Sequence, residues 1–243
     1  MTHTSIDLHA AQTALDAHKQ AFQTLLEMLI EANKTVNLTR IETPEQIRLR
    51  HFLDSLAALN VLDAAAGQTR GFSMIDVGSG AGFPALAIAI ARPQWQVVSL
   101  EATDKKVQFQ RKVCAALGLN NVRVLHGRAE LCAHDPTLRE QFDAVAARAV
   151  AGLDVLAELT LGFVRQGGLG VFWKGQQGQA EVDVAQAAAG QMGAAFTRLL
   201  DYRLPDESNS GAAMTLVVAE KVRKTPQDYP RSNFGVIKKR PLC

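Results

Sequence analysis

Met74-Ile-Asp-Val-Gly-Ser-Gly-Ala-Gly-Phe-Pro84 is the stretch of this 243-residue chain that decides its fold. An apolar run leads directly into a loop with three glycines, Gly78, Gly80 and Gly82, and a helical pattern follows. In open α/β sheets, such a strand, loop and helix form the nucleotide-binding position at the carboxyl end of the first strand. Glycine is required there because a side chain would fill space that the ligand needs. The stretch therefore predicts a ligand site on a nucleotide-binding fold.

The spacing of the glycines narrows the class of ligand. Dinucleotide-binding loops use the pattern GxGxxG, and the helix that follows presents free backbone N–H groups to a pyrophosphate. Here the pattern is GxGxG, Phe83 takes the place of the last glycine, and Pro84 has no N–H group. Glu101 stands at the end of the next apolar run, where an acidic side chain accepts hydrogen bonds from ribose hydroxyls. The spacing argues against a pyrophosphate, and Glu101 indicates a ribose.

Further along the chain, short apolar runs alternate with helical stretches. Strands are expected at residues 72–77, 96–101, 122–125, 142–147 and 169–173, with helices near 85–92, 105–117, 152–164 and 179–192. This alternation predicts an α/β fold with a doubly wound, mostly parallel sheet. A final pair of runs, 195–202 and 213–222, is separated by the turn sequence PDESNSG and by no helix. The pair predicts an antiparallel hairpin at the edge of a seven-stranded sheet.

Two helices are expected before the sheet begins. Apolar residues between Leu15 and Ile30 have helical spacing, and a second helix opens with Thr43 as its N-cap and Pro44 at its first position. We therefore divide the chain into three parts. They are a helical region, 1–66, packed on the core, an α/β domain, 67–222, and a C-terminal tail, 223–243.

The charge of the chain is unevenly distributed. The whole chain has a formal net charge of +2, yet residues 221–243 hold seven cationic residues and only Asp228 as an anion, a net charge of +6. The rest of the chain therefore carries the difference, a net charge of −4. A basic tail on a mildly acidic body predicts that a polyanionic partner binds at one edge of the molecule. A solvated tail that only keeps the chain soluble is an equally good explanation of the charge.

The composition excludes several classes of protein. Hydrophobic residues make up 47% and charged residues 21%, as in an ordinary soluble globular protein. No apolar run reaches the roughly 18 residues of a membrane helix, and the N-terminus lacks the layout of a signal peptide, so we expect a cytoplasmic protein. The three cysteines have no CxxC spacing and the six histidines have no metal-binding spacing, so no metal is expected. Nothing indicates an obligate dimer, and a monomer is predicted.

With these features in place, the chain resembles the class I S-adenosylmethionine-dependent methyltransferases. More narrowly, it resembles the glucose-inhibited division protein B family, the 16S ribosomal RNA guanine-N7 methyltransferases. The resemblance extends from about residue 30 to the end of the chain and depends on motifs that follow one another in the family's order. These are Asn37-Leu-Thr39, His51-Phe-Leu-Asp-Ser-Leu56, Asp76-Val-Gly-Ser-Gly-Ala-Gly-Phe-Pro84, Glu101 with Lys105-Lys106, Ala129-Glu130, Arg148-Ala149, Lys174-Gly175 and Thr225-Pro-Gln-Asp-Tyr-Pro-Arg231. A glycine loop alone is weak evidence, whereas the ordered set is specific.

The resemblance implies S-adenosylmethionine as the cofactor and N7 of guanine 527 in 16S ribosomal RNA as the methyl acceptor. The cofactor contacts that it implies are Gly78, Phe83, Ala129, Glu130 and Arg148, with Glu101 on the ribose and with Gly80 and Gly82 in the same loop. The chain departs from the family at Ala85, Ala87 and Ala147, where Gly, Pro and Ser are usual. We expect these small substitutions to change local packing rather than cofactor binding.

The chemistry of this reaction sets modest demands on the protein. Methyl transfer from a sulfonium is an in-line displacement, so the enzyme must mainly align donor and acceptor. Guanine N7 carries a lone pair and no proton, so neither a general base nor a metal is required. The candidate residues on the acceptor side are Asn37, His51, Asp54 and Ser55. Asp54 is equally well explained as a polar group that ties the second helix to the sheet.

The expected partner is 16S ribosomal RNA or the small ribosomal subunit. Candidate RNA contacts are Arg40, Arg48, Lys174, Arg223, Lys224, Arg231, Lys238, Lys239 and Arg240, and the tail residue Lys221 is expected to contact phosphate as well. Aromatic residues are sparse, so Phe83 and Phe52 are the candidates for stacking on a guanine, although each fits a core position equally well. Two alternative functions remain open, an NAD-dependent oxidoreductase and a non-catalytic RNA-binding factor for ribosome assembly.

Overall fold

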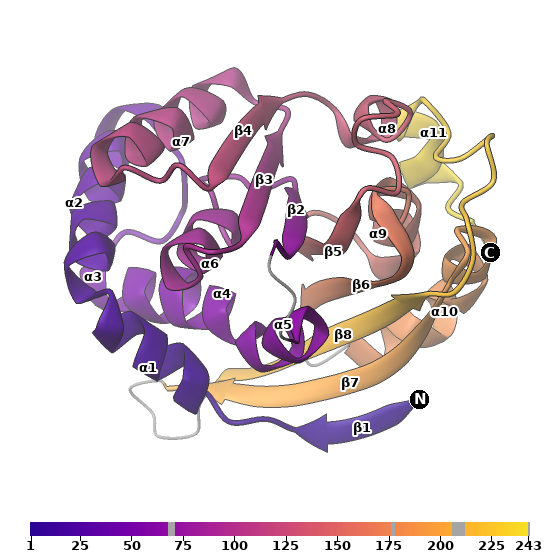
Figure 1. The fold of residues 1–243 in the computed structure, drawn as a ribbon, viewed down its shortest axis with the longest axis horizontal. Coiled ribbons are helices and arrows are strands. Elements are labelled where there is room, and N and C mark those ends of the chain that lie inside the picture. The colour runs from indigo at the N-terminus through magenta and orange to yellow at the C-terminus, as the bar shows by residue number, and fades with distance from the viewer. Residues whose placement is uncertain (68–70, 176–177, 206–211, 243) are drawn as a thin grey trace.

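The computed structural model describes residues 1–67, 71–175, 178–205 and 212–242 and contains one eight-stranded sheet (Figure 1). The strands are β1 (Thr2–Ser5), β2 (Ser73–Val77), β3 (Gln96–Glu101), β4 (Val122–His126), β5 (Phe142–Arg148), β6 (Val164–Lys174), β7 (Ala194–Leu204) and β8 (Ala212–Lys221). Their order is β1-β7-β8-β6-β5-β2-β3-β4, and only β8 runs antiparallel to its neighbours. The predicted α/β fold, with its mostly parallel sheet, is confirmed.

The sheet has one strand more than the seven that the sequence predicts. Strand β1 pairs in parallel with β7, from Thr2 opposite Arg198 to Ser5 opposite Asp201, so the hairpin of β7 and β8 is not the edge of the sheet. All four residues of β1 are exposed, and without apolar alternation they give no strand pattern in the sequence. The predicted turn PDESNSG, beyond Pro205, lies outside the described residues.

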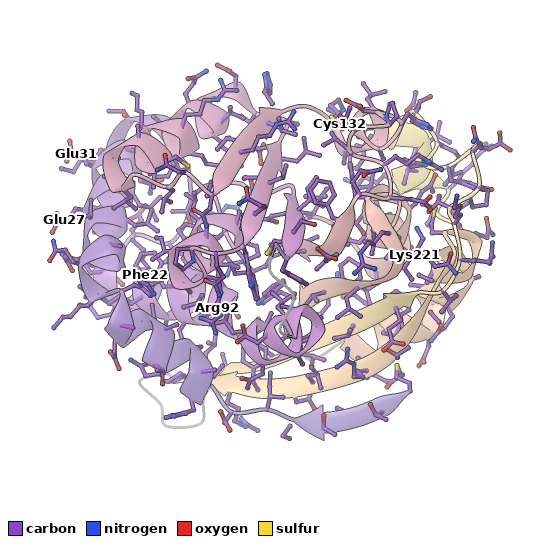
Figure 2. All side chains as sticks on the ribbon, viewed as in Figure 1. Phe22, Glu27, Glu31, Arg92, Cys132 and Lys221 are labelled. Atoms are coloured by element: carbon purple, nitrogen blue, oxygen red, sulfur yellow. The ribbon has the colours of Figure 1, made fainter. Side chains whose placement is uncertain are left out.

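Helices cover both faces of the sheet. They are α1 (His9–Ala17), α2 (Lys19–Val36), α3 (Pro44–Ile47), α4 (Asp54–Leu56), α5 (Leu59–Ala66), α6 (Ala85–Ala91), α7 (Asp104–Leu117), α8 (Ala129–Cys132), α9 (Leu153–Thr160), α10 (Gly178–Gln191) and α11 (Phe234–Lys239). Alternate residues of a strand enter different cores: Met74 packs with the N-terminal helices, whereas Ile75 packs with α9 and α10. On α2, Phe22 points inward while Glu27 and Glu31 face solvent (Figure 2).

The predicted second helix begins as expected but is not uniform. The Thr43 side chain accepts a hydrogen bond from the backbone N–H of Gln46, and Pro44 is the first helical residue. After α3, residues Arg48–Leu53 form a π-helical segment, η1, before α4 continues. Such segments occur frequently at functional sites. Among the described residues, no helix combines the length and hydrophobicity of a bilayer-spanning segment.

Candidate functional site

The three glycines of the loop after β2 all have positive φ angles, but they serve different purposes. At Gly78, with φ of 74°, an added Cβ would lie 2.7 Å from the Val150 side chain, and at Gly82, with φ of 97°, it would collide with Leu86. Gly80 has φ of 61°, and nothing lies within 4 Å of where its Cβ would be. Gly78 and Gly82 therefore allow close packing, whereas Gly80 faces open space where a ligand can approach the backbone.

Glu101 is bound directly to this loop. Its side chain is buried, and its Oε2 accepts the backbone N–H of Gly80 at 2.8 Å while its Oε1 accepts that of Thr103 at 2.8 Å. A carboxylate oxygen can accept a second hydrogen bond, so both oxygens retain capacity for the hydroxyls of a ribose. The position that the sequence assigns to Glu101 and its geometry in the structure therefore fit a nucleoside.

A buried polar network supports the loop from below, and sequence reasoning missed it. Gln110 donates from Nε2 to the carbonyl oxygen of Gly80 at 2.8 Å and to the hydroxyl of Ser79 at 2.9 Å. The Ser99 hydroxyl donates to Ser79 at 2.7 Å. The available signal was a polar residue in the apolar stripe of α7, between Val107 and Val113.

Asp76, the last but one residue of β2, is completely buried. Its Oδ2 accepts the backbone N–H of Ala85 at 2.9 Å, whereas its Oδ1 has no hydrogen-bond partner in the described part of the chain. Burial raises the pKa of Asp76 to about 7, against the lowering effects of the Ala85 hydrogen bond and of the Arg148 charge. An acidic group with unused hydrogen-bonding capacity thus lies directly beneath the glycine loop.

Arg148, at the end of β5, joins the sheet to the N-terminal region. Its Nη1 donates to Asp54 Oδ2 at 2.7 Å and to the carbonyl oxygen of Arg50 at 2.9 Å, and its Nη2 lies 3.3 Å from His51 Nδ1. Asp54 also accepts the hydroxyl of Tyr202 at Oδ1, and its backbone carbonyl accepts the Trp173 indole N–H at 2.7 Å. The structure therefore favours the interpretation of Asp54 as a group that ties the second helix to the sheet.

His51 is held as a neutral imidazole. Burial, followed by the charge of Arg148, lowers its pKa to about 3. Its Nε2 lies 2.8 Å from the hydroxyl of Thr39, and its ring stacks on Phe83 with centroids 4.7 Å apart. Phe83 and Phe52 are both buried and pack against each other, so neither ring is available to stack on a guanine in this structure.

A cavity of about 420 Å³, here named the η1 cavity, lies between η1 and the carboxyl ends of β5 and β6. Arg50, His51, Asp54, Arg148 and Trp173 are among the residues that line it. These strand ends lie at the same edge of the sheet as the glycine loop, because β2, β3, β5 and β6 are parallel. The η1 cavity is therefore the candidate acceptor site, and Arg50 and Trp173 are lining residues that the sequence did not single out.

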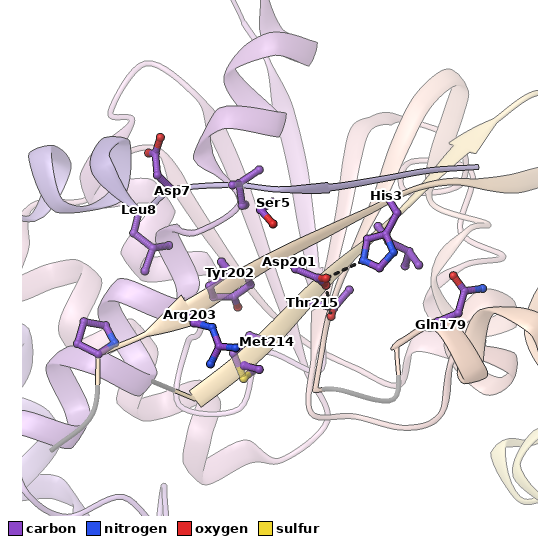
Figure 3. A pocket seen from close by; sticks show the side chains of 14 residues that line it. His3, Ser5, Asp7, Leu8, Gln179, Asp201, Tyr202, Arg203, Met214 and Thr215 are labelled. Atoms are coloured by element: carbon purple, nitrogen blue, oxygen red, sulfur yellow. Dashed lines mark hydrogen bonds and ion pairs between the residues drawn. The ribbon is translucent and has the colours of Figure 1, made fainter. Parts of the chain in front are cut away.

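A second cavity, of about 730 Å³, lies at the β1 end of the sheet (Figure 3). His3, Asp201 and Thr215 line it, and Asp201 accepts hydrogen bonds from both neighbours, at 2.6 Å from His3 and 2.7 Å from Thr215. No residue of the glycine loop is part of its lining. The larger cavity is therefore separate from the candidate cofactor site.

The other predicted acceptor residues do not line the η1 cavity. Asn37 is exposed and ends α2 with φ of 51°. Ser55 is fully buried, and its hydroxyl donates to the carbonyl oxygen of His51 within the helix. Ser55 therefore points into the core at this turn, and its place on the acceptor side stays a prediction.

The cofactor residues predicted after β4 form a compact turn. Ala129 begins α8 and is partly buried, while the Glu130 side chain is buried and accepts the Nε–H of Arg128 at 2.6 Å. Glu130 therefore lies at the same edge of the sheet as Glu101, since β3 and β4 are parallel neighbours. The described residues include no group of three or more His, Cys, Asp or Glu side chains arranged to hold a metal.

The predicted RNA contacts divide into exposed and buried cations. Arg40, Arg48, Arg223, Lys224, Lys238, Lys239 and Arg240 are exposed. Lys174 instead forms an ion pair with Glu181 at 2.7 Å and is only 9% exposed, while Arg231 pairs with the buried Glu158 at 2.6 Å. Lys221 is 1% exposed, so its expected phosphate contact is wrong: the side chain donates to Leu161 and Thr225 inside the protein.

Comparison with known proteins identifies the family. The family model described as rRNA small subunit methyltransferase G matches residues 18–200. The protein named Ribosomal RNA small subunit methyltransferase G from Deinococcus deserti is 44% identical over 222 residues, which cover 91% of this chain and 87% of the relative. The protein of the same name from Leuconostoc citreum is 39% identical, with 96% of this chain and 95% of the relative covered.

The solved structures agree with the fold. TrmN from Thermus thermophilus superposes with a TM-score of 0.51 at 21% identity, covering 72% of this chain and 53% of that one. The class I methyltransferase fold and the glucose-inhibited division protein B family predicted from the motifs are confirmed, whereas the oxidoreductase and the non-catalytic factor find no support among these relatives. The chain therefore belongs to the rRNA small subunit methyltransferase G family.

Proposed function

We propose that this chain transfers the methyl group of S-adenosylmethionine to N7 of a guanine in 16S ribosomal RNA. The observation that carries the proposal is the contact between Gly80 and Glu101. Glu101 accepts the Gly80 N–H at 2.8 Å, and open space lies where a Cβ of Gly80 would be. The loop and the ribose acceptor thus form one fixed unit, which supports a nucleoside whose sugar lies at Glu101 and whose other part passes over Gly80.

The residues at this edge supply binding and orientation. When bound, S-adenosylmethionine supplies a methyl group on a sulfonium centre. Glu101 has acceptor capacity for the ribose, Gly80 lets the backbone come close to the ligand, and the turn at Ala129 and Glu130 is the proposed cover for the adenine. Alignment of donor and acceptor is the main catalytic contribution to a displacement of this kind.

The η1 cavity is the proposed site of the acceptor base. Positive charge moves to the guanine as its N7 takes the methyl group, so a neutral or electronegative surrounding favours the transition state. His51 is uncharged there, since its pKa is lowered to about 3. The charges of Arg148 and Lys174 are balanced by Asp54 and Glu181, each at 2.7 Å, so that Arg50 is the exposed cation of the lining. We infer that His51 and Asp54 line the acceptor site and that neither removes a proton.

The exposed cations are the proposed contacts to RNA phosphates. They comprise Arg40, Arg48, Arg223, Lys224, Lys238, Lys239 and Arg240. Lys174 and Arg231 are not among the proposed contacts, because they form ion pairs with Glu181 and Glu158. We place the protein in the cytoplasm as a monomer that acts on ribosomal RNA.

RNA that carries 7-deazaguanine at the target tests the acceptor atom. Small subunits or 16S RNA from cells that lack this protein would be incubated with radiolabelled S-adenosylmethionine, and the modified nucleotide would be mapped. We expect label on one guanine and none on the 7-deaza analogue, although the analogue should bind with equal affinity. Label on the analogue would show that another atom is methylated, and no label on any RNA would contradict the proposed function.

A further inference from the structure

The C-terminal segment, residues 222–242, returns to the carboxyl ends of the parallel strands, where the proposed cofactor site lies. Strand β8 is antiparallel, so Lys221 lies at the opposite edge from Glu101 and Arg148. From there the chain runs past α9 and ends in α11, which lies beside α8 (Figure 1). Residues distant in sequence from Ala129 and Glu130 are thereby placed next to them.

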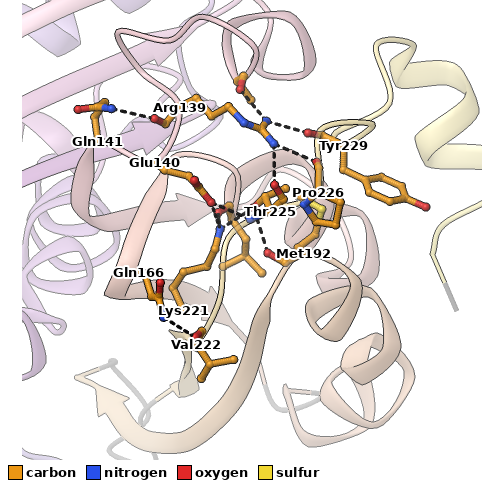
Figure 4. Close-up of polar contacts among 12 residues, drawn as sticks. Arg139, Glu140, Gln141, Gln166, Met192, Lys221, Val222, Thr225, Pro226 and Tyr229 are labelled. Carbon is orange, nitrogen blue, oxygen red and sulfur yellow. Dashed lines mark hydrogen bonds and ion pairs between the residues drawn. The ribbon is translucent and has the colours of Figure 1, made fainter.

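Two groups of polar contacts, here called clamps, fix the path of this segment. The first clamp is formed by Arg139 and Lys221. Arg139 donates to the carbonyl oxygens of Thr225, Pro226 and Tyr229 at 3.0, 2.9 and 2.8 Å (Figure 4). Lys221 donates to the hydroxyl of Thr225 at 2.5 Å. Carbonyl groups that accept a guanidinium in this way hold the backbone itself, independently of the side chains of the tail.

A second clamp lies further along the segment. Glu158 is completely buried and accepts the backbone N–H of Arg231 at 2.8 Å as well as its Nη2–H at 2.6 Å. The imidazole of His134, which follows α8, lies 2.7 Å from the carbonyl oxygen of Pro230. Because a buried carboxylate that lost its partner would be strongly unfavourable, the segment is a fixed part of the domain.

The two clamps place α11 against the turn that covers the proposed adenine site. Ile237 is fully buried and packs on Val155 and Leu159 of α9. On the same helix, the ring of Phe234 lies under the guanidinium of Arg128, with Cζ 5.4 Å from the ring centroid.

Arg128 in turn links this ring to the predicted cofactor residue. Its Nε donates to Glu130 at 2.6 Å, and the Glu130 side chain is only 5% exposed whereas that of Arg128 is 53% exposed. Without a second contact, an exposed arginine samples many rotamers. The aromatic face restricts it to the orientation that pairs with Glu130.

We propose that Phe234 is a positioning residue of the cofactor site, which acts through Arg128 on Glu130 and so sets the affinity for the adenosine end of the cofactor. This inference rests on the proposed function. It gives the C-terminal helix a role in cofactor binding that is separate from its cations.

Calorimetry with S-adenosylmethionine tests the role of the ring. We expect Phe234→Leu to weaken binding by about two- to fivefold, which corresponds to one cation–π contact at a partly exposed site. Phe234→Trp should bind S-adenosylmethionine at least as tightly as the wild type does, since tryptophan binds a guanidinium best. Val236→Ala, which changes a 42% exposed side chain on the same helix, is the matched control and should bind as the wild type does. The thermal midpoints of all variants should agree within a few degrees.

A double-mutant cycle with Arg128→Met separates positioning from general packing. If the ring acts through Arg128, Phe234→Leu should cause no further loss in the Arg128→Met background, and affinity for 16S RNA should stay unchanged throughout. The inference would be overturned if the losses of cofactor affinity from the two substitutions added up in the double variant. It would also be overturned if Phe234→Leu alone left the affinity for S-adenosylmethionine unchanged. A wild-type protein that binds no S-adenosylmethionine would overturn the proposed function as well, so the two failures are distinct.

Discussion

Asp54 and Arg148 form a buried ion pair, with Oδ2 and Nη1 2.7 Å apart and with side chains 6% and 12% exposed. One residue belongs to α4 and the other ends β5, so the pair fastens the N-terminal helices to the carboxyl edge of the sheet. Tyr202 of β7 donates to the same carboxylate. The pair therefore links three segments that surround the η1 cavity.

Replacing Asp54 with Ala should destabilise the protein strongly. Removal of one partner leaves the Arg148 charge buried and uncompensated, which costs about 3–5 kcal/mol in the free energy of unfolding. Asp63→Ala is the control, because Asp63 forms a comparable pair with Arg92 whose side chains are more exposed, at 39% and 20%. Urea unfolding should show a clearly smaller loss for the control. Equal losses would contradict the structural role of the Asp54 pair.

Gly80→Val should abolish binding of S-adenosylmethionine. The added branch would fill the space over the loop and would disfavour the positive φ of 61°. Gly118→Val is a close control, since Gly118 caps α7 with φ of 62° and also has nothing within 4 Å of an added Cβ. Both variants carry the same backbone strain, but only the first should lose the cofactor in calorimetry. Equal affinities in two folded variants would remove Gly80 from the site.

The rate of methyl transfer should hardly depend on pH. His51 does not titrate near neutrality, because its pKa is lowered to about 3, and guanine N7 has no proton to lose. Apart from the titration of Asp76, whose pKa is raised to about 7 beneath the glycine loop, the single-turnover rate at saturating cofactor and RNA should be nearly flat between about pH 6 and 8.5, without the bell shape of paired acid and base groups. A rate that rises tenfold per pH unit would mean that a proton leaves in the reaction.

Asp76 should make the protein less stable as the pH rises towards neutrality. Its pKa of about 7 in the folded state lies above the ordinary value of 3.8, so the unfolded chain releases this proton first. Stability from this group is therefore complete below about pH 4 and is lost progressively up to about pH 7, by no more than about 4 kcal/mol. Asp76→Asn cannot ionise and should remove that loss in denaturant unfolding at pH 5 and 7.5. Asp135→Asn, at an exposed carboxylate whose pKa is lowered by Thr137, should not remove it.

Neutralising Lys238, Lys239 and Arg240 with Gln should weaken RNA binding and reduce its dependence on salt. Each lost phosphate contact should flatten the log–log slope of affinity against salt concentration by roughly 0.7 to 0.9. Arg231→Gln provides the contrast. It would leave the buried Glu158 carboxylate without its ion-pair partner, so this variant should have a lower thermal midpoint rather than a weaker dependence on salt. An unchanged salt slope in the triple variant would show that these three cations do not contact RNA.

The sequence predicted the features that depend on local pattern. The alternation of strands and helices, the Thr43 cap and the position of Glu101 at the end of β3 are all present in the structure. Each of these features depends on the periodicity or spacing of residues that lie close together in the sequence. The family followed from motifs of the same kind and is confirmed. The division at residues 66 and 222 stays a prediction.

The partners of charged residues could not be predicted in the same way. Lys174, Lys221 and Arg231 are cations in the sequence, but Glu181, Glu140 and Glu158 lie beside them only in the folded chain. Whether a cation is free for RNA thus depends on a tertiary contact. The same holds for Asp54, whose contacts with Arg148 and Tyr202 join residues far apart in the sequence.

Strand β1 also changes what the sheet presents to other molecules. Without it, the eleven residues of β7 would form an open edge with unpaired backbone groups, a template for intermolecular strand pairing. The four exposed residues of β1 pair with four of those eleven residues, from Arg198 to Asp201. The N-terminal strand, which contributes no residue to the proposed active site, thereby shortens the stretch of β7 that is open to pairing with another molecule.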